Sequence, residues 1–386
     1  MKNRKPASWL RKNRAALLVL LAALVIFAAV RVLVAPEKAE AAQAGEYAEY
    51  ENGTVTQVLS DSTEPDPAAD GGYRGEQMLL VEVSTGQYAG ESLQAYNYAG
   101  PLYGVPLKVG DPCTLIISTH ENGDVNATVY EYNRTVPLLV VIGLFLLVTV
   151  LVGGRTGAKS LLGLAFTVAG VFWLLFPALV KGAPTLPSTF ALCVYVAAVS
   201  FVILGGVEKK TICALLGTVG GMAFALIFAL IAQALLKVDG LRSADVEPLL
   251  QLRQTGTPIG LRGLLAAGVI LSSLGAVMDV AMSLSSALSE VRAADPSMDP
   301  KSLFRSGMNI GRDMVGTMTN TLILAFLGSG LVLILYLYSL GLSPHMLVSS
   351  AYLSLEVVSG VSSSVGVILS VPLTAAVCAR AYGRKK

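Results

Sequence analysis

The sequence is poor in charged residues. Of its 386 residues, 14% are Asp, Glu, Lys or Arg and 54% are hydrophobic, and the mean hydropathy is +0.64. An ordinary soluble domain carries about 25% charged residues. So little charge cannot cover a water-facing surface, and several apolar runs reach the length of about 18 residues that indicates a membrane helix. The composition of the whole chain is therefore not that of a soluble protein, and it predicts a polytopic protein in a lipid bilayer.

The motifs of common enzymes and metal sites are also missing. The sequence has no Walker A box, no H-E-x-x-H and no G-x-S-x-G. The four cysteines form no C-x-x-C pair, so neither a zinc ribbon nor a disulfide framework is indicated, and two histidines are too few for a His-rich metal site. No basic, aromatic-rich surface indicates nucleic acid. We therefore expect no enzyme, no catalytic residue, no cofactor, no metal and no nucleic-acid partner.

The N-terminal segment predicts a membrane anchor. The first residues, MKNRKPASWLRKNR, are basic and precede the apolar run AALLVLLAALVIFAAV. The apolar region extends over about 20 residues, whereas the core of a signal peptide spans about 7–15. This length favours an uncleaved anchor, and cleavage near residues 39–44 (AEAAQA) is the alternative.

Residues 36–135 differ from the rest of the chain. They contain a Pro/Asp-rich loop and short alternating runs such as QMLLVEVSTG, and a turn around Asn122-Gly123-Asp124 separates two such runs, as in a hairpin. About five short strands in roughly 100 residues predict a small barrel or sandwich. We expect an OB-like or SH3-like barrel.

The remaining apolar runs predict a helical bundle. Together with the first helix they make about eight spans of roughly 20 residues each. The predicted fold is an all-α membrane bundle with a small β-rich domain after the first helix: residues 1–35, 36–135 and 136–386. The last run is too long for one span, and we expect a break within 356–366. The seven later runs are 136–153, 160–180, 187–207, 211–237, 263–287, 314–339 and 345–379.

The distribution of Lys and Arg predicts the orientation. With the N-terminus in the cytoplasm, the predicted cytoplasmic pieces hold 18 Lys and Arg residues and the short outer loops hold 5. Cytoplasmic loops carry the excess of positive charge in most membrane proteins. We therefore expect both termini in the cytoplasm, the β-rich domain outside it, and a location in a bacterial cytoplasmic membrane.

One predicted helix carries a carboxylate far from its ends. An Asp at the centre of a membrane helix costs about 2.5–3.5 kcal/mol, so Asp279 is a functional candidate. Ser272, Gly275, Ser283 and Ser286 recur with it at helical spacing and form one polar stripe of small residues. Such a stripe suits a bundle interior or an ion pathway better than contact with lipid.

Two further polar groups follow on the last spans. Asp313, Thr317 and Asn320 lie at i, i+4 and i+7, and Thr321 follows. Antiparallel packing of the two helices would bring Asn320 to the depth of Asp279, where an Asp–Asn–Thr cluster suits a proton or cation.

Glu356 is the third candidate, followed by Ser359, Gly360 and Ser363. A carboxylate beside a Gly/Ser break is typical of the unwound segments of transporters. A purely structural role is the alternative to an ion site. Each Ser and Thr here would then hydrogen-bond to its own helical turn, and Asn320 would bond to a neighbouring helix.

These features together resemble a known family. One N-terminal helix, a β-rich domain and a bundle with LSSLGAVMDVAMSLSSAL, GRDMVGTMTNTLILAFLG and a final Glu–Gly/Ser segment are similar to the YibE/F family of bacterial membrane proteins. The resemblance implies a multi-pass membrane protein of permease type and no particular biochemical activity.

A looser resemblance is to the membrane helices of SecD/SecF and the RND group. The counterparts here would be Asp279, Asp313, Thr319, Asn320 and Thr321. The small outer domain and two extra spans depart from that pattern. The resemblance would imply coupling to a proton gradient.

We expect an ion-coupled, in the first place proton-coupled, transporter or exporter of an unidentified small molecule or ion. The candidates for coupling are Asp279, Asp313, Asn320 and Glu356. A homo-oligomer or a membrane partner fits the small-residue stripes.

One alternative is a non-transporting envelope protein that binds or signals through its β-rich domain. A membrane hydrolase that uses Asp279 and Asp313 is disfavoured by the position of Asp313 near the interface. The supporting polar residues are Ser272, Ser283, Thr317, Thr321, Ser359 and Ser363.

Overall fold

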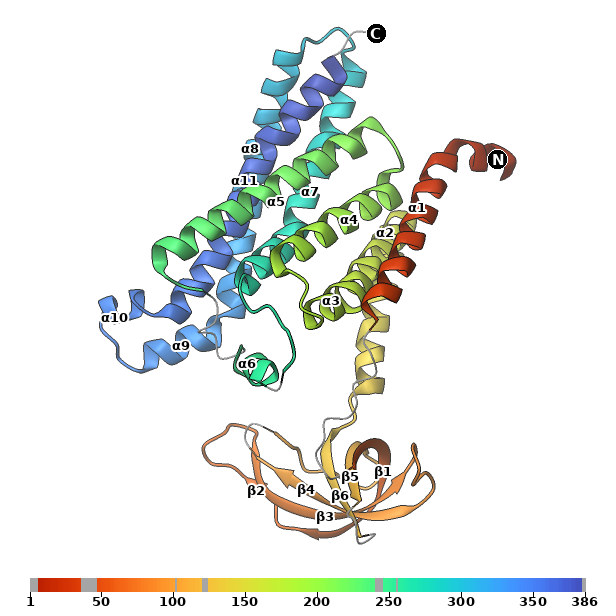
Figure 1. Ribbon diagram of the computed structural model, residues 1–386, viewed down its shortest axis with the longest axis vertical. Helices are drawn as coiled ribbons and strands as arrows, with labels where there is room; N and C mark the ends of the chain where they lie inside the picture. The colour runs from red at the N-terminus through yellow and green to blue at the C-terminus, as the bar shows by residue number, and fades with distance from the viewer. Residues whose placement is uncertain are drawn as a thin grey trace. The chain divides into compact units, whose positions relative to one another are not determined.

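A computed structural model describes residues 6–35, 47–100, 103–119, 124–239, 246–254 and 256–383. The chain divides into two compact units: Glu37–Val148 forms one, and Met1–Pro36 with Thr149–Lys386 forms the other. The first contains all the strands in the described residues, and the second is helical (Figure 1). The fold class predicted from the sequence is confirmed.

The smaller unit is built on a closed five-stranded barrel. The strand order β1-β5-β6-β4-β3 is closed by pairing of β1 with β3, and β4 and β6 run parallel. Closure leaves no unpaired edge, and this order with one parallel pair is that of an OB-type barrel. The antiparallel pair β5–β6 is the predicted hairpin, whose residues 122–123 lie outside the described part. The strands are β1 (Tyr47–Asp61), β2 (Glu64–Pro65), β3 (Tyr73–Val83), β4 (Ser92–Ala99), β5 (Pro112–Thr119) and β6 (Val125–Tyr132).

Alternation of apolar and polar residues fills the barrel. On β3, Leu79, Val81 and Val83 point inward and are at most 1% exposed. Two buried amides complete the interior: Asn97 Nδ2 donates to Gln77 Oε1 at 2.9 Å, and Gln77 Oε1 also accepts from the Leu107 amide at 2.8 Å. Because both amide side chains have partners, their burial carries no unsatisfied polar group.

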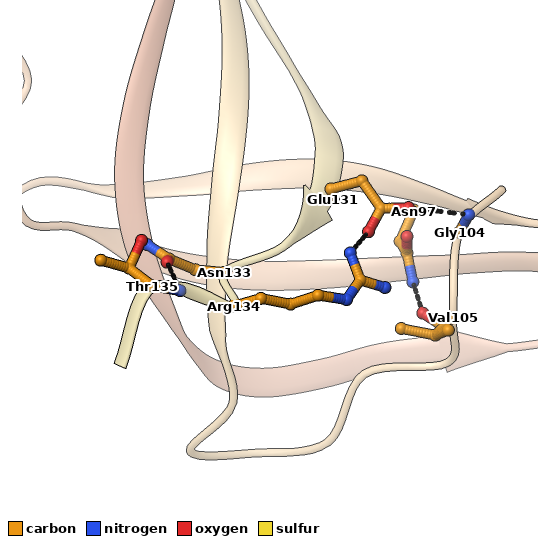
Figure 2. Close-up of polar contacts among 7 residues, drawn as sticks. All are labelled: Asn97, Gly104, Val105, Glu131, Asn133, Arg134 and Thr135. Carbon is orange, nitrogen blue, oxygen red and sulfur yellow. Dashed lines mark hydrogen bonds and ion pairs between the residues drawn. The ribbon is translucent and has the colours of Figure 1, made fainter. Parts of the chain in front are cut away.

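Polar contacts lie around the end of β6, where the chain leaves the barrel and enters α2. Figure 2 shows Asn97 Nδ2 donating to the Val105 carbonyl at 2.9 Å, and the Arg134 guanidinium paired with the Glu131 carboxylate. Asn133 Oδ1 accepts from the Thr135 amide at 3.0 Å, which caps the first turn of α2.

The helical unit contains six helices that are long and apolar enough to span a membrane, or seven if the bent pair α8–α9 is one span, within the described residues. We expected about eight. The helices are α1 (Pro6–Val34), α2 (Thr135–Gly170), the π-helix η1 (Val171–Leu175), α3 (Phe176–Val180), α4 (Thr185–Gly205), α5 (Lys209–Leu236), α6 (Glu247–Gln254), α7 (Leu264–Ala294), α8 (Pro300–Ser329), α9 (Leu331–Ser339), α10 (Pro344–Val348) and α11 (Ala351–Gly383).

The difference in number arises in the stretch Thr135–Val180. This stretch of 46 residues contains two of the predicted spans, 136–153 and 160–180. A straight helix of that length would extend about 69 Å, more than twice the roughly 30 Å of a hydrocarbon core. Gly154 interrupts it with φ 54° and ψ −135°, a backbone conformation that glycine adopts readily. The single stretch is therefore long enough for two spans joined at this glycine.

Small residues bring α5, α7 and α11 into close contact. A Cβ atom on Gly221 of α5 would lie 2.8 Å from Ser370 Cβ of α11 and 2.8 Å from Val277 Cγ1 of α7. On the other side of α11, a Cβ on Gly307 of α8 would lie 2.9 Å from Ala375 Cβ. Close approach through glycine is the usual way that membrane helices pack. As a result α11 lies between α5, α7 and α8 (Figure 1).

The predicted break within 356–366 is wrong, because α11 is continuous from Ala351 to Gly383. The hydroxyls of Ser359 and Ser364 donate to Leu355 O and Gly360 O at 3.0 and 2.8 Å, so they are satisfied by their own helix. The break lies instead between α8 and α9, which meet at Gly330 and bend by 60°.

Candidate functional site

Glu356 lies against the bend between α8 and α9. It stands in the second turn of α11 and is half-buried. A Cβ atom on Gly330 would be 3.5 Å from both Cγ and Cδ of Glu356. The carboxylate predicted to neighbour a helix break therefore does neighbour one, and the break belongs to a different helix.

The start of α9 lies beside this carboxylate. Gly330 precedes α9, and Ile334 N donates to Gly330 O at 2.9 Å as the first bond of the helix. The preceding amides have no partner within the helix, and this end carries positive partial charge. Among the described residues, no hydrogen bond or ion pair reaches Glu356. The carboxylate therefore lies where α8 ends and α9 begins, and it has no counter-ion among the described residues.

Glu356 faces a cavity of 830 Å³ between α7, α8, α9 and α11. Apart from Gly and polar residues, Leu, Val and Phe side chains line it, and Glu356 is the one charged residue in its lining as described. A concave, mostly apolar site with a few polar groups is the usual form of a small-molecule site. The polar lining residues are Ser272, Ser329, Tyr336, Tyr352, Glu356 and Ser359.

The polar stripe of α7 begins in this cavity. Ser272 lines the cavity, and its Oγ lies 3.3 Å from Ser363 Oγ of α11. Ser272, Gly275, Asp279 and Ser283 are all exposed on one face of α7. Asp279 follows Ser272 by seven residues, which is about two helical turns. At 1.5 Å per residue, it lies about 10.5 Å further along the axis of α7. The stripe thus leads from the cavity toward the Ala294 end of α7.

The opposite face of α7 faces the bundle. Leu274, Val277, Leu284 and Leu288 are at most 4% exposed. Ser286, expected on the stripe, is half-buried. The expected place of the stripe in the bundle interior is therefore wrong: the apolar face of α7 packs in the bundle, where it buries more hydrophobic area, and the polar stripe lies on the exposed face.

The predicted Asp–Asn–Thr cluster on α8 lies outside the cavity. Asp313, Thr317 and Asn320 are exposed and do not line the cavity, and no hydrogen bond joins Asn320 to Asp279 among the described residues. Thr317 Oγ1 donates to Met314 O at 3.1 Å, and Thr321 Oγ1 donates to Thr317 O at 2.9 Å. The threonines thus satisfy their own helix, and the ion site of Asp279 with Asn320 stays a prediction.

Most of the cavity lining was not predicted from the sequence, where only Ser272, Glu356 and Ser359 were candidates. Tyr336 and Tyr352 line the cavity, and Gly330 gives it the space beside Glu356. The signal for the bend was present as the segment Gly328-Ser329-Gly330 within an apolar run, because Gly and Ser interrupt helical patterns. The tyrosines gave no signal, since aromatic residues are common at the ends of membrane helices.

A comparison with models of protein families shows to which family the chain belongs. The model of the YibE/F-like protein family matches residues 141–384, which is more than half of the chain. The chain belongs to the YibE/F-like protein family. The match includes Asp279, Asn320 and Glu356, whereas the barrel strands lie outside it. No curated protein and no solved structure matches the chain. For this YibE/F-like protein, the likeness to SecD/SecF and the RND group stays a prediction.

Proposed function

We propose that this YibE/F-like protein is a proton-coupled secondary transporter or exporter, and that the cavity at Glu356 holds its substrate. One observation carries the proposal: an unpaired carboxylate lies in an open cavity between α7, α8, α9 and α11, directly beside a bent helix pair. Ionisable residues at membrane depth mark ion and substrate pathways in most membrane proteins.

The bent helix supports transport in particular. Discontinuous helices expose helix ends and backbone carbonyls at a substrate site, and bundles move around such sites during transport. Here α9 begins at Gly330 next to the carboxylate. A continuous helix at this position would leave neither the helix end nor the space beside Glu356.

Asp279 is the proposed second proton carrier. It lies on the same face of α7 as Ser272, which lines the cavity. In hydrocarbon its ionised form would cost about 2.5–3.5 kcal/mol. A proton exchanged between Asp279 and Glu356 along the Ser272–Gly275 face would couple the substrate to the gradient.

The proposal includes a location and an orientation. The protein lies in a bacterial cytoplasmic membrane with both termini in the cytoplasm and the barrel outside, as the Lys and Arg distribution indicates. We propose no enzymatic activity, because the cavity lining has no nucleophile paired with a base.

Metabolite profiling of a deletion strain tests the proposal. A compound that accumulates or disappears in that strain should return to normal with the wild type and not with Glu356→Gln. Glu290→Gln is the matched control, because Glu290 is exposed near the end of α7 and lies outside the cavity lining. Flux of that compound in proteoliposomes should then depend on an imposed pH gradient. Gradient-independent flux, or full rescue by Glu356→Gln, would contradict the proposal.

A second function, binding by an envelope protein that does not transport, is favoured by the barrel. Exposed tyrosines gather on it: the rings of Tyr50 and Tyr130 meet at 5.4 Å, and those of Tyr96 and Tyr98 stack at 6.4 Å. Exposed aromatic residues are enriched at binding surfaces. This function predicts that Glu356→Gln and Asp279→Asn restore a deletion strain as well as the wild type does.

A further inference from the structure

We infer that the cavity at Glu356 binds an organic cation with an apolar body, such as a quaternary ammonium or phosphonium compound. The inference rests on the proposed function, because it names the substrate class of the same cavity. It is carried by the charge, the lining and the size of the cavity, and each of the three excludes a different class of ligand.

Charge excludes anions and zwitterions with an exposed acid. Glu356 is the one charged residue of the described lining, and it lies beside the start of α9. No Lys or Arg of the described residues pairs with it. An anionic ligand would add a second negative charge, and a neutral ligand would bury the carboxylate without a partner, which is unfavourable. A cation supplies the missing partner.

The lining excludes small hydrated cations. Leu, Val and Phe side chains make up most of it, and the polar groups are hydroxyls that cannot replace a full hydration shell. Phe326, Tyr336 and Tyr352 add three aromatic rings. Rings attract cations through their faces, most strongly when water is displaced. A cation whose charge is spread over an apolar body matches both features.

Size excludes the smallest amines. The cavity has a volume of 830 Å³, whereas sites for drug-sized ligands measure about 300–1,000 Å³. A methylated ammonium ion would fill only a small part of this space. A body with several rings or long alkyl chains would cover the apolar lining.

The same carboxylate explains how a proton gradient would drive such a substrate. A cation binds the carboxylate, a proton arriving at Glu356 neutralises it, and the cation then leaves while the proton stays on the carboxyl. One proton enters for each cation released, so charge is balanced. The other titratable groups of the described lining are the phenols of Tyr336 and Tyr352, and the exchange uses neither of them.

Equilibrium binding to the purified full-length protein in detergent tests the substrate class. The probes are tetraphenylphosphonium and tetraphenylborate, which have nearly the same shape and opposite charge. We expect saturable binding of one phosphonium per chain, binding of the borate at least tenfold weaker, and phosphonium binding that weakens as the pH falls. Equal binding of the two probes would overturn the inference.

Variants assign the binding to Glu356. Glu356→Gln should weaken phosphonium binding at least tenfold, whereas Glu356→Asp keeps the charge and Glu290→Gln changes no lining residue, so both should stay within about threefold of the wild type. Unchanged elution of each variant in gel filtration checks the fold. Wild-type affinity in Glu356→Gln would overturn the inference.

The two proposals fail in different ways. If phosphonium binds and yet a pH gradient drives no phosphonium flux in proteoliposomes, the transport proposal fails and the cation site stands. If the wild type binds no phosphonium while a metabolite moves in a manner that depends on Glu356, the substrate class fails and transport stands.

A second inference is carried independently by α8. Its face toward α11 contains Leu303, Gly307 and Gly311, all buried. The opposite face is exposed and repeats at spacings of four and three residues. A repeat of this kind is the seam of a two-stranded helical pair. The seam consists of Asn309, Asp313, Gly316, Asn320, Ile323 and Leu327.

We propose that a second copy of the chain covers this seam, with the two α8 helices parallel about a two-fold axis. A Cβ on Gly316 would meet no atom within 4 Å, so a helix can approach closely there. The exposed Arg312 and Asp313 are adjacent, and a two-fold axis lets each pair with the opposite charge of the other copy. Asn320 can bond its own counterpart, as Asn does at one seam position of many helical dimers.

Disulfide cross-linking in native membranes tests the dimer. Asn320→Cys should form a covalent dimer on mild oxidation, and Ala325→Cys, exposed on the other side of α8, should not. The wild type provides the background of the four natural cysteines, which are buried. Gly316→Leu should lower the dimer fraction in light scattering at least tenfold. A monomeric mass for the wild type, or cross-linking of Asn320→Cys to another protein only, would overturn the proposal.

Discussion

Two carboxylates of the helical unit lie in different environments, and this difference is the reason that we propose binding for one and proton coupling for the other. Glu356 lies in the cavity beside the start of α9, whereas Asp279 is exposed on α7 away from the cavity lining. The sequence indicated both as functional candidates because ionisable groups at this depth are costly. It did not indicate which of them lies in a cavity, because the cavity is formed by α9, whose start depends on the bend at Gly330.

Asp279→Asn should retain binding and lose coupling. Asp279 lines no part of the cavity, so phosphonium affinity should stay within about threefold of the wild type, while flux driven by a pH gradient falls at least tenfold. Binding to solubilised protein and flux in proteoliposomes measure the two quantities. Asp299→Asn, which changes an exposed helix cap, is the control. Normal gradient-driven flux in Asp279→Asn would refute its assignment as a proton carrier.

A residue of the barrel gives a prediction of pH dependence. Hydrogen bonds from Thr63 and Gln77 lower the pKa of Asp61 from its ordinary value of 3.8. A carboxyl whose pKa is lower in the folded state stabilises it above pH 3.8, and this contribution is lost as the pH falls through the folded-state pKa. Asp61→Asn should therefore unfold at a lower temperature than the wild type near neutral pH, and the difference should shrink below pH 3.8. Thermal unfolding of residues 36–135 at several pH values measures this. An equal difference at pH 7 and pH 3 would contradict it.

The helices and strands could be predicted from the sequence where a single physical rule determines them. Apolar length predicts the helices, and alternation predicts the strands of the barrel. The rules failed at two glycines. Gly154 interrupts a stretch of 46 residues, and Gly330 takes the break that we expected within α11. In α11, Ser and Gly serve close packing, as at Gly366, where a Cβ would lie 2.8 Å from Ala225 Cβ. Composition alone does not distinguish a packing glycine from a breaking one.

Packing between the central helices gives a prediction about stability. Gly221→Ala should destabilise the bundle by about 1–3 kcal/mol, because its methyl group would overlap Ser370 and Val277 where three helices meet. Gly275→Ala is the matched control, since a Cβ there meets no atom within 4 Å, and Ala is the better helix former. Thermal unfolding in detergent should show a lower midpoint for the first and an unchanged or higher one for the second. The same midpoint for both would contradict the packing.

At the scale of the whole chain, charge separates the two units as clearly as fold does. Residues 47–132 contain 13 Asp and Glu against 2 Lys and Arg, whereas the complete chain carries a net charge of +2. The barrel is therefore strongly acidic and the helical unit is basic. An acidic domain disfavours binding to anionic lipid or nucleic acid, and the same charge keeps it soluble. The domain order was readable from composition, but closure of the barrel depends on pairing between β1 and β3, which no local pattern indicates.

The barrel should fold without the bundle, because its core is its own. Its buried residues come from its own strands and the loop at Leu107, and Cys113 among them is 0% exposed. Burial, with a smaller contribution from Asp111, raises the pKa of the Cys113 thiol to about 11, so few thiolates exist at pH 8. Residues 36–135 expressed alone should give a cooperative thermal transition.

Thiol labelling measures the same closure at one residue. Iodoacetamide should label Cys113 at least a hundredfold more slowly in buffer than in urea. Thr114→Cys on the partly exposed side of β5, in a Cys113→Ala background, is the control and should react without unfolding. Rapid labelling of Cys113 in buffer would mean that the barrel needs the helical unit to close.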